Sequence, residues 1–228
     1  MVGLEVGILR RMRYKGFYFM DTNNSKKIIL DLCGGTGSWS LPYKKHGYDV
    51  RNITLPDYDV IKLSEDPELW KIPLGKVYGI LAAPPCTQFS VAKTHGRPRD
   101  MREGMKIVNA CLKIIWSCQY NLESPYSRKT TLKFWAMENP KGMLELFLGK
   151  PAFQFQPYEF GDNYSKKTCL WGNFNEPKRL VLISIPPPRK NMKYLFNPVK
   201  EKRDFKKIAE LRSITPKGFA EAFFRANQ

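Results

Sequence analysis

The strongest constraint on the fold is a short apolar segment, Ile28–Leu32, that runs directly into the string Gly34-Gly35-Thr36-Gly37. An apolar run of this length that ends in glycines predicts a buried strand followed by a tight turn. Residues 38–46 then suit a helix, and Gly47 suits the end of that helix. A strand, a glycine-rich turn and a helix in this order let the backbone approach a bulky ligand closely.

The same alternation of strands and helices continues toward the C-terminus. Asp100 can cap the longest helix. One apolar stripe runs along that helix, formed by Met101, Met105, Val108, Leu112 and Ile115. Further strands are predicted at residues 48–54, 77–83, 132–137, 152–155 and 168–171, and shorter helices at 142–148 and 218–226. This pattern predicts an α/β fold with a mostly parallel, doubly wound sheet, in which ligands bind beyond the carboxyl ends of the strands.

The charge of the chain indicates a polyanionic partner. Thirty-eight Lys and Arg against 21 Asp and Glu give a net charge of +17, and nucleic acid is the commonest partner of such an excess. Residues 189–207 are especially basic and carry interleaved aromatic residues, a combination that can contact phosphates and stack on bases. An anionic membrane is disfavoured, because we find no basic amphipathic helix with an aromatic face and no apolar run long enough to span a bilayer.

The cysteines favour a reducing compartment. They number five and include no CxxC pair, which argues against a disulfide framework and against a zinc site, so no metal is expected. The N-terminal apolar stretch is followed at once by arginines and lacks the cleavage site of a signal peptide. We therefore expect a cytoplasmic protein.

Cys86 differs from the other cysteines in its context. It follows Pro84-Pro85 at the end of a predicted strand and precedes a polar loop. A thiolate at such a position can attack an electron-poor ring carbon. The string Met137-Glu138-Asn139-Pro140 ends another predicted strand, and a carboxyl group there can stabilise charge and share a proton with the attacked ring. Because strand ends meet at one edge of a parallel sheet, the two strings are expected to lie together.

With these motifs in this order, the chain from about Lys26 to its end resembles the DNA (cytosine-5) methyltransferases, in a small form like those of phages and prophages. The resemblance implies a Rossmann-like, S-adenosylmethionine-dependent methyltransferase fold with a small target-recognition insertion. It implies methylation of cytosine C5 in duplex DNA through a covalent adduct between Cys86 and C6, after the base is flipped out. NAD and FAD are disfavoured independently, because Ser40 stands where their motif needs a third glycine.

The resemblance also implies a role for each matching residue. The expected cofactor-binding residues are Asp31, Leu32, Cys33, Gly35, Thr36, Gly37, Asp59, Val60 and Pro84. The expected catalytic residues are Cys86, Glu138, Asn139 and Lys167, the last because the family places a basic residue in a strand to bind the cytosine O2. The expected DNA-binding residues are Gln88, Ser90, Lys93, Arg97, Arg99, Arg189, Lys190, Lys193 and Arg212.

The predicted organisation has four parts. They are an N-terminal extension (residues 1–25), a catalytic core (26–173), a reduced target-recognition region (174–211) and a C-terminal helix that returns to the core (212–228). The small recognition region predicts a short or loose target site. We expect a monomer that binds double-stranded DNA in a bacterial host cell or its nucleoid.

Three alternatives stay open at this stage. The same scaffold could use a modified cofactor and transfer a carboxymethyl group, because the acid that binds the ribose hydroxyls in the family is not obvious here. An RNA cytosine-5 methyltransferase would share the chemistry. A catalytically weak homologue could act as a DNA-binding module, although both Cys86 and Glu138 are present.

Overall fold

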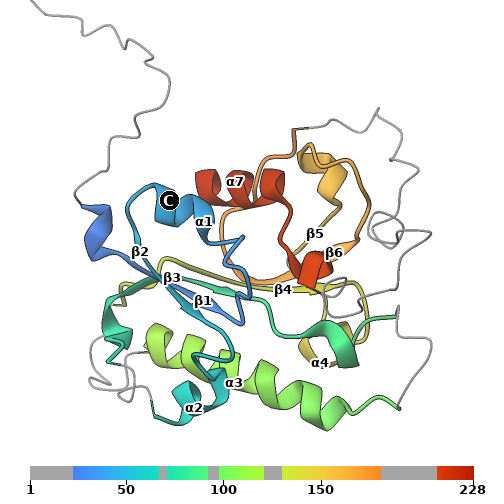
Figure 1. Cartoon of the computed structure of the whole chain (residues 1–228), viewed down its shortest axis with the longest axis horizontal. Coiled ribbons are helices and arrows are strands. Elements are labelled where there is room, and N and C mark those ends of the chain that lie inside the picture. Colours follow the sequence, from blue (N-terminus) through green and yellow to red (C-terminus); the bar gives the residue numbers. More distant parts are fainter. Residues whose placement is uncertain (1–22, 67–70, 92–97, 121–129, 181–209) are drawn as a thin grey trace, which may run out of the picture.

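A six-stranded sheet forms the centre of the computed structural model, which describes residues 23–66, 71–91, 98–120, 130–180 and 210–228 (Figure 1). The strands are β1 (Ile28–Leu32), β2 (Asp49–Ile53), β3 (Val77–Ala82), β4 (Phe134–Pro140), β5 (Phe153–Phe155) and β6 (Thr168–Asn173). Their order in the sheet is β2-β1-β3-β4-β6-β5. The first four strands run parallel, whereas β6 is antiparallel to both β4 and β5. The predicted mixed α/β fold with a mostly parallel sheet is thereby confirmed.

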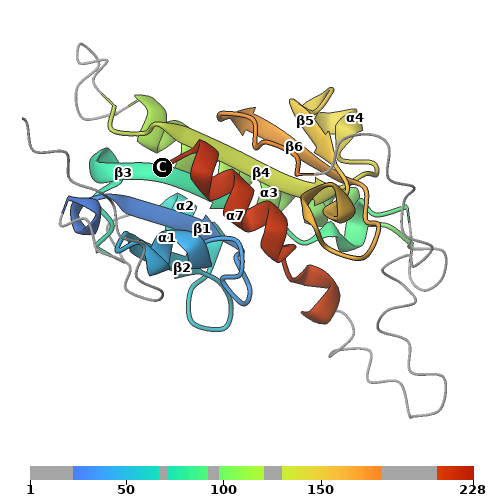
Figure 2. The same cartoon turned by 90° about the horizontal axis from the view of Figure 1, so that it is seen from above.

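Helices cover both faces of this sheet (Figures 1 and 2). The helices are α1 (Leu41–Lys45), α2 (Val60–Glu65), α3 (Met101–Tyr120), α4 (Glu145–Leu148) and α7 (Lys217–Ala226), with 3₁₀ turns η1 (Asn24–Lys26), η3 (Leu74–Lys76), η4 (Cys86–Gln88) and η5 (Pro157–Phe160). Alternate residues of each strand point to opposite faces, and this divides the core into two apolar layers. Leu30 and Ile80 pack with α2 and α3 in one layer, whereas Ile29 and Leu81 pack with the aromatic side chains of α1 and α7 in the other.

Three local differences from the sequence predictions have simple causes. The helix predicted at residues 38–46 begins only at Leu41, because Pro42 lacks an N–H group and is tolerated in the first turn but not deeper in a helix. The strand predicted at 132–137 continues to Pro140, since its last residues pair with the antiparallel β6. The helix α2 was not predicted, because six residues are too few to show a clear helical period.

The strand order places the glycine-rich turn, the turn that carries Cys86 and the end of β4 next to one another. The sheet extends from β1 in both directions, toward β2 on one side and toward β3 on the other. In open parallel sheets a ligand crevice forms where the order reverses, beyond the carboxyl ends of the strands. Here the turns after β1 and β3 flank this point, and β4 lies beside β3.

The described residues cover the predicted parts of the chain unevenly. Of the N-terminal extension only residues 23–25 are described, and of the recognition region only 174–180 and 210–211. Within the described ranges, no helix has both the length and the apolar character needed to cross a membrane.

Candidate active site

The turn that carries Cys86 is held in place from several sides. Beyond β3 the chain passes through Pro84 and Pro85 into η4, which begins at Cys86. The Nδ2 group of Asn139 donates a hydrogen bond of 2.9 Å to the main-chain carbonyl of Pro84. At the far end of the turn, Met143 N donates to the Phe89 carbonyl at 2.8 Å. The backbone that presents the thiol is therefore fixed by β4 and by the segment just before α4.

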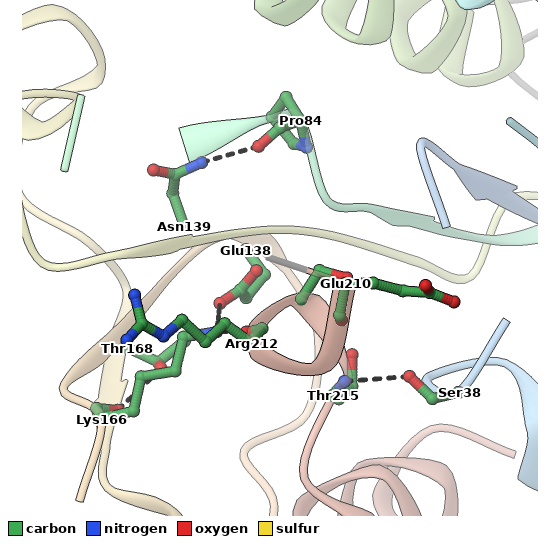
Figure 3. Close-up of polar contacts among 10 residues, drawn as sticks. Ser38, Pro84, Glu138, Asn139, Lys166, Thr168, Glu210, Arg212 and Thr215 are labelled. Atoms are coloured by element: carbon green, nitrogen blue, oxygen red, sulfur yellow. Dashed lines mark hydrogen bonds and ion pairs between the residues drawn. The ribbon is translucent and has the colours of Figure 1, made fainter. Parts of the chain in front are cut away.

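The side chains of Glu138 and Asn139 point to opposite faces of the sheet. Adjacent residues in a strand point to opposite sides, so Asn139 is fully buried toward Pro84 while Glu138 points to the other face (Figure 3). There the Oε1 atom of Glu138 lies 3.8 Å from Lys166 Nζ, and both side chains are only 16% exposed. The Nζ group of Lys166 also donates to the Arg212 carbonyl at 3.2 Å.

Two neighbouring lysines, Lys166 and the predicted Lys167, take different positions relative to Glu138. Lys166, rather than Lys167, faces the Glu138 carboxylate. Lys167 is exposed, and its charge lies near Cys169 instead. The two lysines are neighbours just before β6, and the order of basic residues in the sequence could not show which one turns inward.

Cys86 lies within electrostatic reach of this pair. Its side chain is half-buried, and burial is the main cause that raises the pKa of its thiol. The negative charge of Glu138 raises that pKa further, whereas the positive charge of Lys166 lowers it. The structure thus brings together Cys86, Glu138 and Asn139 as predicted neighbours, and it adds Lys166.

The glycine-rich turn after β1 adopts the left-handed conformations that its glycines allow. Gly35 and Gly37 have φ angles of 54° and 69°, values that L side chains rarely adopt. A Cβ atom at Gly34 would lie 2.4 Å from Asp31 Cγ and 2.5 Å from Asn52 Oδ1. The turn is therefore folded tightly onto the carboxyl ends of β1 and β2, which leaves Gly35 and Thr36 exposed.

Two buried oxygen atoms under this turn have no hydrogen-bond donor among the described residues. Asp31 is fully buried and accepts a hydrogen bond of 2.5 Å from the Ser40 hydroxyl through Oδ2, but its Oδ1 atom has no partner. Asn52 donates to the Gly35 carbonyl at 2.9 Å, and its Oδ1 atom is likewise buried without a partner. Burial raises the pKa of Asp31 from 3.8 to about 6, although the bond from Ser40 opposes this shift.

The exposed part of this turn is the candidate cofactor surface. Gly35 and Thr36 are exposed at the carboxyl end of β1, where α/β sheets bind ligands, and the buried side chains of Asp31 and Asn52 lie beneath them. Ser40 and Asn52 were not predicted for this site; the only signal was that Asn52 lies close to the end of the second predicted strand (48–54), beside the first. In the part of the chain that the structure describes, no three His, Cys, Asp or Glu side chains could hold a metal ion.

Several predicted cofactor-binding residues pack in the core or cap a helix. Leu32 and Val60 are core side chains, so only their backbones could face a ligand. Cys33 has a φ of 57° and packs against the core. The carboxylate of Asp59 caps α2 by accepting the Ile61 N–H at 2.9 Å. Near it, Leu55 and Tyr58 are exposed side chains in the turn after β2.

Four of the predicted DNA-binding residues can be placed. Gln88 Oε1 accepts a hydrogen bond from Asp100 N at 3.0 Å, and the Gln88 carbonyl accepts one from Arg99 at 3.1 Å, so Gln88 and Arg99 are in direct contact. Ser90 forms a bridge with Gly142, and Arg212 is exposed beside Lys166. Lys93, Arg97, Arg189, Lys190 and Lys193 lie outside the described residues.

Comparisons with known proteins add distant similarity to solved structures only. No model of a known protein family matches the chain, and no curated protein matches it. Among solved structures, a methyltransferase from Entamoeba histolytica is similar over 77% of this chain, with 15% sequence identity and a TM-score of 0.34. The chain spans 61% of the length of that protein. A likeness at this level carries no argument about activity, which has to be drawn from the site.

Proposed function

We propose that the protein is an S-adenosylmethionine-dependent methyltransferase of Rossmann-like fold that methylates C5 of cytosine in DNA. One observation carries the proposal. A cysteine at the end of β3 and a carboxylate at the end of β4 lie close enough for their charges to interact, while Asn139 fixes the turn that presents the cysteine. A simple structural turn would not need a nucleophile and a carboxyl group at the same point.

The chemistry of cytosine explains why both groups are needed. C5 of cytosine is too weak a nucleophile to accept a methyl group directly. When the Cys86 thiolate forms a bond to C6, electron density moves through the ring, and C5 gains the character of an enamine carbon. Negative charge develops at N3, where the Glu138 carboxyl group can donate a proton or a hydrogen bond. After methylation, loss of the C5 proton and breakage of the bond between sulfur and C6 restore the aromatic base and the free thiolate.

The glycine-rich turn is the proposed cofactor site. The exposed residues Gly35 and Thr36 would lie against the cofactor, and the buried side chains of Asp31 and Asn52 would support the turn from beneath. S-adenosylmethionine supplies the methyl group when bound.

Duplex DNA is the proposed substrate because of the net charge of +17. Basic residues neutralise phosphates and release counterions, which gives sequence-independent affinity. A base inside a duplex is out of reach of Cys86, so the target must be flipped out of the stack.

The test is Cys86→Ala, with Cys118→Ala in α3 as a matched control far from the motif strings. Nucleosides from duplex DNA incubated with S-adenosylmethionine are analysed by mass spectrometry. The wild-type protein and the control should yield 5-methyldeoxycytidine, and Cys86→Ala should yield none while it still binds the cofactor. DNA in which fluorine replaces the hydrogen at C5 should form a stable covalent complex with Cys86, because fluorine cannot leave as a proton. Methylation by Cys86→Ala would refute the mechanism, and methylation of RNA in preference to DNA would change the substrate.

A further inference from the structure

The turn that carries Cys86 lies in a slot between two glycines that are far apart in the sequence. Gly104 is in the first turn of α3 and Gly142 lies shortly before α4, and both helices lie on the same face of the sheet (Figure 1). A Cβ atom at Gly104 would lie 2.9 Å from Gln88 Cβ and 2.9 Å from Phe89 Cζ. A Cβ atom at Gly142 would overlap the main-chain carbonyl oxygen of Phe89. Neither wall of the slot therefore has room for a side chain.

The glycine in α3 is not explained by helix formation. Glycine is among the poorest residues for the interior of a helix, yet Gly104 is buried in the first turn of the longest helix. A residue without a Cβ atom lets a second piece of backbone approach closely. The close approach of η4 to α3 at Gly104 supplies the missing reason.

Hydrogen bonds fix the turn to both walls of the slot. Gln88 Oε1 accepts a hydrogen bond from Asp100 N at 3.0 Å. Asp100 in turn caps α3, because its Oδ1 atom accepts from Glu103 N at 2.9 Å. On the opposite wall, Met143 N donates to the Phe89 carbonyl at 2.8 Å. The slot thus combines close packing with directional bonds on each side.

The main chain transmits the position of the slot to Cys86. The Cys86 carbonyl accepts hydrogen bonds from Phe89 N at 2.9 Å and from Ser90 N at 2.8 Å. Phe89 is fully buried, and close-packed interiors leave little space for movement. A displacement of Gln88 or Phe89 would therefore move Cys86 as well.

We propose that Gly104 and Gly142 are positioning residues for Cys86, because they allow α3 and the segment before α4 to clamp the turn from both sides. The inference rests on the proposed function, since it concerns the same cysteine. Attack on a ring carbon needs the sulfur atom within a narrow range of distance and direction. A methyl group on either wall would displace the sulfur atom from that range without touching it.

The first test compares Gly104→Ala with Asn109→Ala, which changes an exposed residue of the same helix and is the matched control. Alanine is the better helix former at both positions, so the contact with η4 distinguishes the two variants. Gly104→Ala should lower kcat for methyl transfer by about tenfold to a hundredfold, with the KM for S-adenosylmethionine close to that of the wild type. Asn109→Ala should keep both values.

Hydrogen exchange followed by mass spectrometry gives a second readout, which needs neither cofactor nor DNA. The amides of Phe89 and Ser90 should exchange about tenfold faster in Gly104→Ala, because overpacking weakens their bonds to the Cys86 carbonyl. Gly142→Ala should accelerate the same amides and that of Met143 as well. Peptides from β1 should exchange as in the wild type in both variants.

A double-variant cycle tests whether the cause is steric. Gln88→Gly removes the Cβ atom that a side chain at residue 104 would meet. In this background Gly104→Ala should accelerate exchange of the Phe89 amide less than it does in the wild type. An equal effect in both backgrounds would overturn the slot as the cause.

The two readouts separate failure of the inference from failure of the proposed function. If the wild type methylates DNA and Gly104→Ala has the same kcat as Asn109→Ala, the inference fails and the function stands. The inference also fails if exchange accelerates while kcat is unchanged, because the slot would then have a structural role alone. If the wild type methylates no DNA but exchange around Cys86 accelerates in Gly104→Ala and not in Asn109→Ala, the slot holds the turn and the proposed function fails.

Discussion

Replacement of Asp31 by asparagine is expected to stabilise the protein at pH 8 and to have little effect of this kind at pH 4. Asp31 is fully buried under the glycine-rich turn, and burial raises its pKa from 3.8 to about 6. The folded protein therefore binds this proton more tightly than the unfolded chain does. As a result, the ionised carboxylate destabilises the fold above the folded pKa, and this penalty disappears as the pH falls toward the unfolded pKa.

The size of the effect follows from the shift. A difference of about 2 pKa units corresponds to about 3 kcal/mol of unfolding free energy when the group is ionised in both states. At pH 4 most of the folded and much of the unfolded population is protonated, so less than about 1 kcal/mol remains. An asparagine side chain keeps an oxygen for the Ser40 hydroxyl and offers an N–H group toward Asn52, whose Oδ1 atom has no donor among the described residues.

Urea unfolding of the wild type and of Asp31→Asn at pH 8, 6 and 4 measures this difference. Asp57→Asn, at an exposed position in the turn after β2, is the matched control. The stability gain of Asp31→Asn should shrink steadily as the pH falls, while the control should show no such trend. A difference between wild type and Asp31→Asn that is the same at all three pH values would refute the reasoning.

Two further predictions concern the turns after β1 and β3, which flank the point where the strand order reverses. Asn139→Ala leaves the Pro84 carbonyl without its buried donor. It should lower the free energy of unfolding in urea by about 1–3 kcal/mol and slow alkylation or catalysis at Cys86. Asn163→Ala, at an exposed position, is the control, and equal stability of the two variants would contradict the role of Asn139. Gly34→Ala places a Cβ atom 2.4 Å from Asp31 Cγ, so it should weaken binding of S-adenosylhomocysteine in calorimetry and cost about 1–3 kcal/mol by overpacking. Gly75→Ala, where a Cβ meets nothing within 4 Å, should do neither.

Much of the fold could be predicted because it depends on local pattern. Apolar runs that end at glycines or prolines fix where strands stop, and every predicted strand that lies in the described residues is present. The pattern of Met101, Val108 and Ile115 also placed the longest helix correctly. The antiparallel pairing of β6 with β4 was not predictable, because pairing depends on how the chain returns after β5 and not on the composition of either strand.

The candidate site, like the fold, could be predicted only in part. The sequence by itself determined that Cys86 and Glu138 stand at strand ends, because proline and glycine punctuate the chain there, and parallel strands bring such ends to one edge of the sheet. Only the tertiary structure decided which neighbours complete the site. Lys166 instead of Lys167 faces Glu138, Asn52 faces Asp31 under Gly34, and residues 210–215 return to both. These neighbours depend on the direction in which each side chain points and on contacts between residues far apart in the sequence. Lys166 and Arg212, for example, are more than 40 positions apart. A local sequence pattern contains neither kind of information.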